Sequence, residues 1–129
     1  MSHFSIIKIK IKNPYVTLLK KAVELIAKEI GGEVVSRIND YYGRAMDCII
    51  GIKSADFPRG IGVKINSSGE VEVVGDFWKV RPDAVENFQK ALVQYYTALA
   101  MQQALAQLGY HVQVNKVNDK VHVRGVALL

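Results

Sequence analysis

The chain has 129 residues, half of them apolar, which is the size of one ordinary domain with its own hydrophobic core. Its single cysteine excludes an internal disulfide bond and a zinc site built from several cysteines, and is typical of a protein in a reducing, cytoplasmic compartment. The formal net charge of +5 is concentrated in residues 1–32, where six lysines outnumber two glutamates, so the basicity is local.

The first predicted element is a strand over residues 5–12, where isoleucine and lysine alternate with the two-residue period of a strand that buries one face. Its inward positions are Ile7, Ile9 and Ile11, and its outward positions are Lys8, Lys10 and Lys12. A helix is expected next, with Asn13 as its cap and Pro14 as its first residue. The glycine pair 31–32 ends that helix.

Six further strands are predicted from apolar, β-branched runs bounded by turn signals, over residues 33–38, 45–53, 61–66, 70–74, 110–115 and 120–126. In the last hairpin Val112, Val114, Val121 and Val123 share the inner face, and His122 lies opposite Asn115. A long helix begins at Asp83, where Glu86 completes a capping-box pattern, and ends at Gly109.

These elements predict a single α+β domain over residues 1–129, with an antiparallel or mixed sheet of six to seven strands and two helices on one face. Each half of the chain has the order strand, helix, strand, strand. Tandem βαββ units, and with them an internal duplication, are therefore left open.

The most informative stretch runs from Ala91 to Leu108, because this helical sequence contains no charged residue. At about 100° per residue, one stripe of the helix faces the sheet and comprises Val85, Phe88, Leu92, Tyr95, Tyr96 and Leu99. A second stripe, more than a quarter turn away, comprises Val93, Ala100, Met101, Ala104 and Leu108. We expect this second stripe to meet another copy or another protein, unless residues 15–30 of the same chain cover it.

Three segments, the opening residues 1–5, Gly75-Asp76-Phe77-Trp78, and the helix from Val85 to Tyr110, resemble a family of conserved reading frames in cyanobacterial and algal chloroplast genomes. That family also has bacterial and archaeal relatives. It carries no established activity, cofactor or catalytic residue. Its members tend to be encoded near an ATPase of the AAA type, so the resemblance implies such an ATPase as a protein partner.

Two other sites are weighed against this assembly function. Nucleic-acid binding is the first alternative, through a polar sheet face carrying Lys8, Lys10, Lys12 and Arg124, although no aromatic residue on that face would stack on bases. A small-molecule site in the loop from Gly75 to Asp83 is the second, because Asp76, Trp78, Lys79 and Arg81 crowd there. The competing interpretation of this loop is that Phe77 and Trp78 close the end of the core.

No catalytic motif, phosphate-binding glycine loop or spaced set of metal ligands occurs in the sequence, so no catalytic residue, metal ligand or cofactor is predicted and enzymatic activity is left open. Cys48 is expected to be a packed thiol on the face of Ile50. Glutamine, tyrosine and threonine interrupt the uncharged helix, which argues against a membrane span. We therefore expect a non-enzymatic assembly or protein-binding module, acting as a homo-oligomer or with a protein partner.

Overall fold

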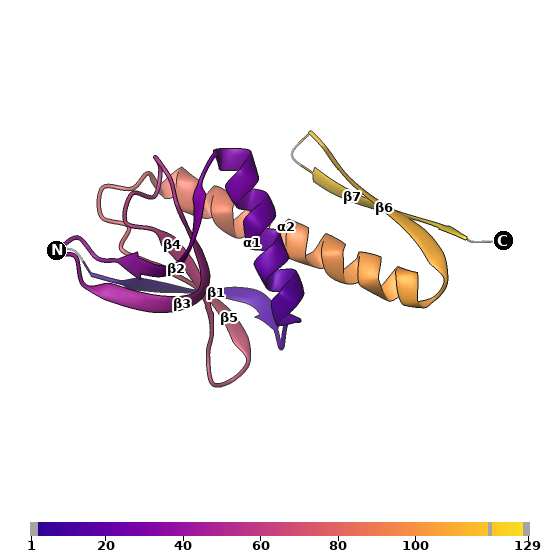
Figure 1. The fold of residues 1–129 in the computed structure, drawn as a ribbon, viewed down its shortest axis with the longest axis horizontal. Helices are drawn as coiled ribbons and strands as arrows, with labels where there is room; N and C mark the ends of the chain where they lie inside the picture. Colours follow the sequence, from indigo (N-terminus) through magenta and orange to yellow (C-terminus); the bar gives the residue numbers. More distant parts are fainter. Residues whose placement is uncertain (1–2, 119, 128–129) are drawn as a thin grey trace.

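The computed structural model describes residues 3–118 and 120–127 of the chain (Figure 1). Its order of elements is β1 (Ser5–Lys12), α1 (Val16–Ile30), β2 (Glu33–Asn39), β3 (Ala45–Lys53), β4 (Ile61–Ile65), β5 (Glu70–Gly75), α2 (Pro82–Gln107), β6 (Tyr110–Val117) and β7 (Lys120–Ala127). All described strand pairs are antiparallel, so the predicted α+β class with an antiparallel sheet is confirmed.

Five strands form the main sheet, in the order β1-β5-β4-β3-β2. One row of side chains crosses this sheet in register, through Ile7, Val73, Val63 and Ile50. This row belongs to the core cluster, which also takes in Leu19 and other side chains of α1, and the start of α2. The predicted alternation of β1 is confirmed, since Ile9 and Ile11 are buried while Lys8, Lys10 and Lys12 are exposed.

The stripe of α2 that was expected to face the sheet does pack into this core. Val85, Phe88, Leu92 and Leu99 are buried members of the cluster, and Tyr95 and Tyr96 are half-buried against it. Tyr96 also accepts a hydrogen bond on its hydroxyl oxygen from the backbone N–H of Tyr15, at 2.9 Å. The first half of α2 is therefore fixed against both the sheet and α1.

Both predicted helix starts are wrong. Asn13 does not cap α1, because its backbone N–H donates to the Gly69 carbonyl at 2.7 Å and its φ of 50° is left-handed. The helix begins two residues after Pro14, at Val16, with no side-chain cap. In α2 the residue before the helix is Arg81, so Asp83 lies inside the first turn and the expected capping box does not form. The predicted end of α1 is confirmed by the left-handed φ of 67° at Gly31.

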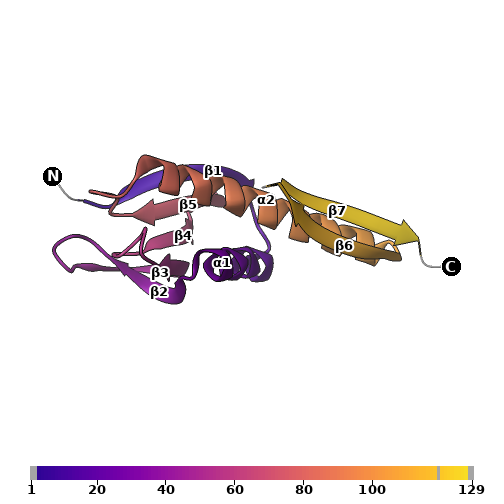
Figure 2. The same cartoon turned by 90° about the horizontal axis from the view of Figure 1, so that it is seen from above.

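The seven strands are divided between two sheets instead of forming one. Among the described strands, β6 and β7 pair only with each other, and they lie along the far half of α2 (Figures 1 and 2). The reason is the length of α2, since 26 residues at about 1.5 Å per residue carry the chain well past the main sheet. The two βαββ halves therefore share an order of elements but differ in packing. After the first helix, β2 and β3 pair within the main sheet, whereas after the second helix β6 and β7 form a separate sheet.

We call residues 100–127, which comprise the end of α2 with β6 and β7, the distal arm. The arm projects along the long axis of the molecule, away from the main sheet (Figure 1). No described residue between Ala100 and Val126 is buried. Within the described part of the chain, neither helix is both long and apolar enough to cross a membrane.

Candidate functional site

The second stripe of α2 is open to solvent in its last part, at Met101, Ala104 and Leu108. Val93 and Ala100 are half-buried and Ala104 is exposed. Met101 is 47% exposed and Leu108 is 74% exposed. Residues 15–30 do not reach Met101, Ala104 or Leu108, because α1 packs beside the middle of α2 at Tyr95 and Tyr96, whereas Val93 packs against the core cluster. The alternative in which the chain encloses the stripe itself is therefore wrong for Met101, Ala104 and Leu108.

The β6–β7 hairpin covers only one flank of the helix end. Leu105 packs on β7 at Gly125, where a Cβ would lie 3.2 Å from a Leu105 methyl carbon, so glycine allows this close approach. Beside that contact a hollow of about 480 Å³ remains between helix and hairpin. Val93 and Met101 of the second stripe line it, together with Val123 of the hairpin.

The register of the hairpin agrees with the prediction. Asn115 pairs with His122, and Val114 pairs with Val123. The four inner valines are half-buried against α2. In a two-stranded sheet each strand has one partner, so both β6 and β7 have an edge with no described strand beside it.

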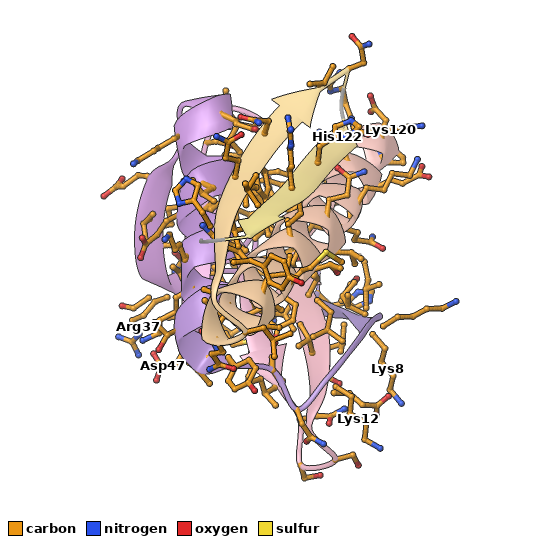
Figure 3. All side chains as sticks on the ribbon, turned by 90° about the vertical axis from the view of Figure 1, so that its right-hand side faces the viewer. Lys8, Lys12, Arg37, Asp47, Lys120 and His122 are labelled. Atoms are coloured by element: carbon orange, nitrogen blue, oxygen red, sulfur yellow. The ribbon has the colours of Figure 1, made fainter. Side chains whose placement is uncertain are left out.

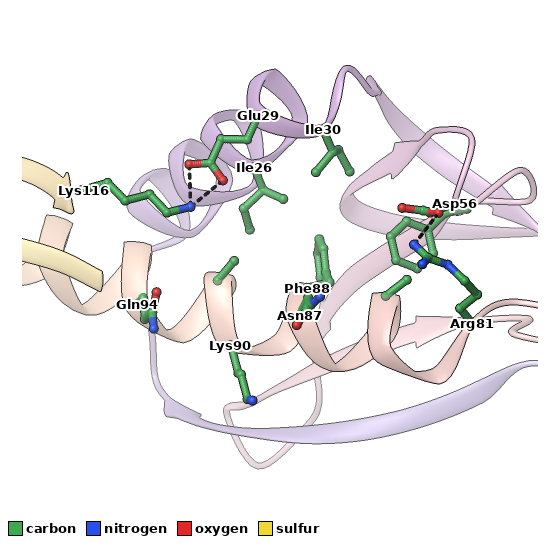
Figure 4. A pocket seen from close by; sticks show the side chains of 13 residues that line it. Ile26, Glu29, Ile30, Asp56, Arg81, Asn87, Phe88, Lys90, Gln94 and Lys116 are labelled. Carbon is green, nitrogen blue, oxygen red and sulfur yellow. Dashed lines mark hydrogen bonds and ion pairs between the residues drawn. The ribbon is translucent and has the colours of Figure 1, made fainter. Parts of the chain in front are cut away.

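A groove of about 450 Å³ lies between the C-terminal end of α1 and the first half of α2 (Figure 4). Ile26, Phe57 and Phe88 contribute its apolar lining. Ion pairs stand at its two ends: Glu29 with Lys116 at 3.0 Å, and Asp56 with Arg81 at 3.1 Å. The first pair connects the distal arm to α1, and the second connects α2 to the β3–β4 loop. Neither pair was found from the sequence, because the partners are 87 residues apart in the first pair and 25 residues apart in the second.

Tyr95 contacts both members of the Glu29–Lys116 ion pair. Its hydroxyl donates to Glu29, and Lys116 lies 5.6 Å from the centre of its ring. Burial, together with the hydrogen bond to Glu29 and the charge of that carboxylate, raises the pKa of Tyr95 to about 12. Tyr95 therefore keeps its proton and remains a donor at neutral pH. These partnered groups give the groove a structural role, because they hold the turn end of the β6–β7 hairpin against α1.

Only some of the residues predicted to form the ligand site in the Gly75–Asp83 loop lie close together. Asp76 is buried, while Trp78 and Lys79 are exposed next to it. Arg81 turns away to pair with Asp56 and Asp83. Phe77 packs against the core as the competing interpretation expected, but Trp78 is 38% exposed and is not part of the core cluster.

The β2–β3 turn completes this site, which sequence reasoning missed. We call the combined group the aromatic–cation cluster; its members are Tyr41, Tyr42, Arg44, Arg59, Trp78 and Lys79. Tyr41 and Trp78 meet edge to face, with ring centres 4.6 Å apart. Tyr42 meets Tyr41 in the same way at 5.5 Å. The sequence feature that could have revealed this site is the pair Tyr41-Tyr42, since two adjacent large aromatic residues are unusual in a tight, exposed turn.

Two buried carboxylates hold the turn. Asp76 accepts hydrogen bonds from the backbone N–H groups of Tyr41 and Trp78, at 2.7 and 3.1 Å, and so joins the two loops. Asp40 accepts from the backbone N–H groups of Tyr42 and Arg44, both at 2.9 Å, and from the Arg44 guanidinium at 2.6 Å.

The pKa of Asp40 predicts an acid-sensitive turn. Burial raises this pKa, but the hydrogen bonds and the charge of Arg44, with the N–H of Tyr42, outweigh it and leave the pKa below its usual 3.8. A lowered folded-state pKa stabilises the protein above the unfolded-state pKa, and this contribution is lost as the pH falls through the folded-state value. We expect Asp40→Asn to make unfolding stability depend less steeply on pH below about 4. Urea unfolding at a series of pH values measures this, and parallel curves for the two proteins would contradict it.

The predicted nucleic-acid face does not form a continuous basic surface. Lys8 lies 3.8 Å from the Glu70 carboxylate, and its pairing partner on β5 is Glu72. Arg124 is on β7, in the other sheet. Figure 3 shows Lys8 and Lys12 well apart from Lys120 and His122 of the hairpin.

Cys48 does not lie on the face of Ile50 as expected. A Cβ built on Gly62 would stand 3.1 Å from its sulfur, so the thiol lies on the face where Gly51 and Gly62 oppose each other. A register shift in the pairing of β2 with β3, between Val35 and Arg37, accounts for the changed alternation. Burial raises the pKa of the Cys48 thiol, which disfavours the reactive thiolate.

The histidines are not gathered into a metal site. His111 and His122 are exposed on different strands of the hairpin. Over residues 3–118 and 120–127, no three histidine, cysteine or carboxylate side chains are placed to hold one metal ion.

Comparison of the chain with protein-family models, with curated proteins and with solved structures finds no match.

Proposed function

We propose that this protein is an assembly module in which two copies join through their distal arms. The observation that carries this proposal is the lack of any buried residue among the described residues from Ala100 to Val126. A helix end and a two-stranded hairpin have too little contact area to form a stable core alone. The surface of a partner packed on the arm would bury its apolar side chains.

Charge favours a second copy as that surface. At a two-fold interface each side chain meets the same patch of its partner, so charged patches repel one another. The helix from Ala91 to Leu108 carries no charge and therefore no such repulsion. Met101 and Leu108 provide apolar contact area, and Ala104 allows two helices to approach closely.

Light scattering across a range of protein concentrations tests the proposal. We expect wild-type particles of two chains, and we expect the double change Met101→Glu with Ala104→Glu to raise the dissociation constant at least about 100-fold, because burying unpaired carboxylates is costly. Both positions are open to solvent in the single chain, so the variant should fold normally by circular dichroism.

A matched control places the same change in charge on α1. Thr17→Glu with Lys21→Gln alters two exposed positions by the same total charge and should leave the particle mass unchanged. A wild-type particle of one chain would contradict self-association. It would instead favour a different protein on the arm, such as the AAA-type ATPase that the family resemblance implies. An unchanged mass in the Met101 and Ala104 variant would show that the second stripe is not the interface.

A further inference from the structure

The aromatic–cation cluster has an arrangement that packing alone does not explain. Tyr41 and Tyr42 are exposed, Tyr42 by 67%, and Trp78 by 38%. Each of the three rings has a cation within 6 Å of its centre: Arg59 on Tyr41, Arg44 on Tyr42 and Lys79 on Trp78. Large aromatic side chains are usually buried in a protein of this size, so three exposed rings in one place mark a binding surface.

Hydrogen bonds to two buried carboxylates hold the loops of the cluster in place. Asp40 and Asp76 are the buried charged residues of the described chain, and both accept hydrogen bonds from the loops that carry the rings. Arg59 adds hydrogen bonds to the carbonyl oxygens of Asp76 and Trp78. Burying a carboxylate is costly unless it is well bonded. Both buried carboxylates thus serve to fix side chains that themselves face solvent.

Backbone strain at Lys79 is a second, independent sign. Its φ of 61° lies in the left-handed region, which a lysine adopts at a cost. This conformation accompanies an ammonium group 4.6 Å from the centre of the Trp78 ring. Such strain persists where the surrounding structure enforces it, and it is concentrated at binding sites.

We propose that the aromatic–cation cluster binds single-stranded nucleic acid. The Asp40 and Asp76 carboxylates behind the cluster are buried, whereas Lys79 is exposed and the side chain of Arg44, which pairs with Asp40, remains 72% exposed, so the solvent side of the cluster is positive. Exposed rings stack on unpaired bases, and the cations held over these rings attract the phosphates between those bases. In a duplex the faces of the paired bases are stacked inside the helix, so we expect the same rings to bind a duplex more weakly than a single strand.

This site is distinct from the predicted lysine face and from the distal arm. Lys8 and Lys12 lie on β1 and pair across to Glu72 and Glu70 of β5, whereas the cluster is built from the β2–β3 turn, Arg59 of the β3–β4 loop and the β5–α2 loop. The β2–β3 turn is at the opposite end of the long axis from the arm (Figure 2). Strand binding at the cluster therefore does not depend on assembly through the arm.

The tryptophan provides a direct readout, because Trp78 is the only one in the chain. We expect a thymidine oligonucleotide of about ten nucleotides, within the usual span of such sites, to quench its fluorescence with an affinity that falls as salt rises. The Tyr42→Ala variant should bind about tenfold more weakly. The Lys79→Gly variant keeps the left-handed backbone, since glycine accepts it, and should lower the slope of affinity against salt by about one.

Three controls make the result decisive. Tyr15→Ala removes a tyrosine that is 61% exposed on another surface and should bind like the wild type. The triple change of Lys8, Lys10 and Lys12 to serine should also bind like the wild type. A duplex, thymidine monophosphate and inorganic polyphosphate should each bind more weakly than the single strand.

The proposal is overturned by an absence of quenching, or by equal binding of the single strand to the Tyr42→Ala protein. Equal affinity for the duplex or for polyphosphate would show a general attraction of polyanions. Equal affinity for the monophosphate would show a nucleotide site, and loss of binding only in the triple lysine variant would place the strand on β1.

Discussion

Replacing Leu92 by alanine should lower the free energy of unfolding by about 2–5 kcal/mol, the range found for truncating a fully buried leucine. Leu92 is fully buried in the core cluster, where α2 packs against the main sheet. The loss combines the apolar surface no longer buried with the cavity left behind, since neighbouring strands cannot close it. Urea unfolding followed by circular dichroism measures the change.

Leu108→Ala is the matched comparison for Leu92→Ala, with the same chemical change at the residue that follows the last turn of the same helix. Leu108 is 74% exposed, so at concentrations where the protein is a single chain its truncation should cost less than about 0.5 kcal/mol. At higher concentrations Leu108→Ala should weaken assembly, while Leu92→Ala should leave the particle mass of the folded protein unchanged. Equal destabilisation of the single chain by both variants would contradict the division into a packed body and an open arm.

Asp76→Ala should be the most damaging change outside the hydrophobic core, with a loss of about 2–4 kcal/mol. Its carboxylate accepts hydrogen bonds from the backbone N–H groups of Tyr41 and Trp78, and alanine removes both acceptors. The two loops of the aromatic–cation cluster would then separate, which the fluorescence of Trp78 reports directly. Asp76→Asn keeps one amide oxygen as an acceptor and should lose less stability than Asp76→Ala.

Asp47→Ala provides the comparison for a surface carboxylate. Asp47 pairs with Arg37 at 2.6 Å, but both side chains are largely exposed, and such pairs contribute about 0–1 kcal/mol. If Asp76→Ala destabilises the protein no more than Asp47→Ala, the carboxylate of Asp76 is not what holds the two loops together.

Much of the local structure could be predicted because it depends on short periods in the sequence. The alternation of residues 5–12 gives the buried face of β1, and β3 has the predicted bounds of residues 45–53. The pairing of Asn115 with His122 follows from the central turn of the last hairpin. The burial of Leu92 and its stripe follows from the helical period.

The errors arose where distant parts of the chain compete for the same backbone groups. Asn13 has the side chain of a helix cap, yet its backbone N–H bonds to the Gly69 carbonyl, and the helix starts later. The aromatic–cation cluster was missed for a related reason. Its halves are 35 residues apart between Tyr41 and Asp76, and only the folded sheet brings the β2–β3 turn beside the β5–α2 loop.

The sequence by itself determined the order and type of the elements, the core stripe of α2 and the lack of charge between Ala91 and Leu108, because periodicity and composition are local properties. Only the tertiary structure decided that β6 and β7 leave the main sheet, that no described residue of the arm from Ala100 to Val126 is buried, and that three aromatic rings meet three cations at the other end. The physical reason is that these features depend on the length of a helix relative to the sheet beside it and on hydrogen bonds between distant segments, neither of which a short window of sequence contains.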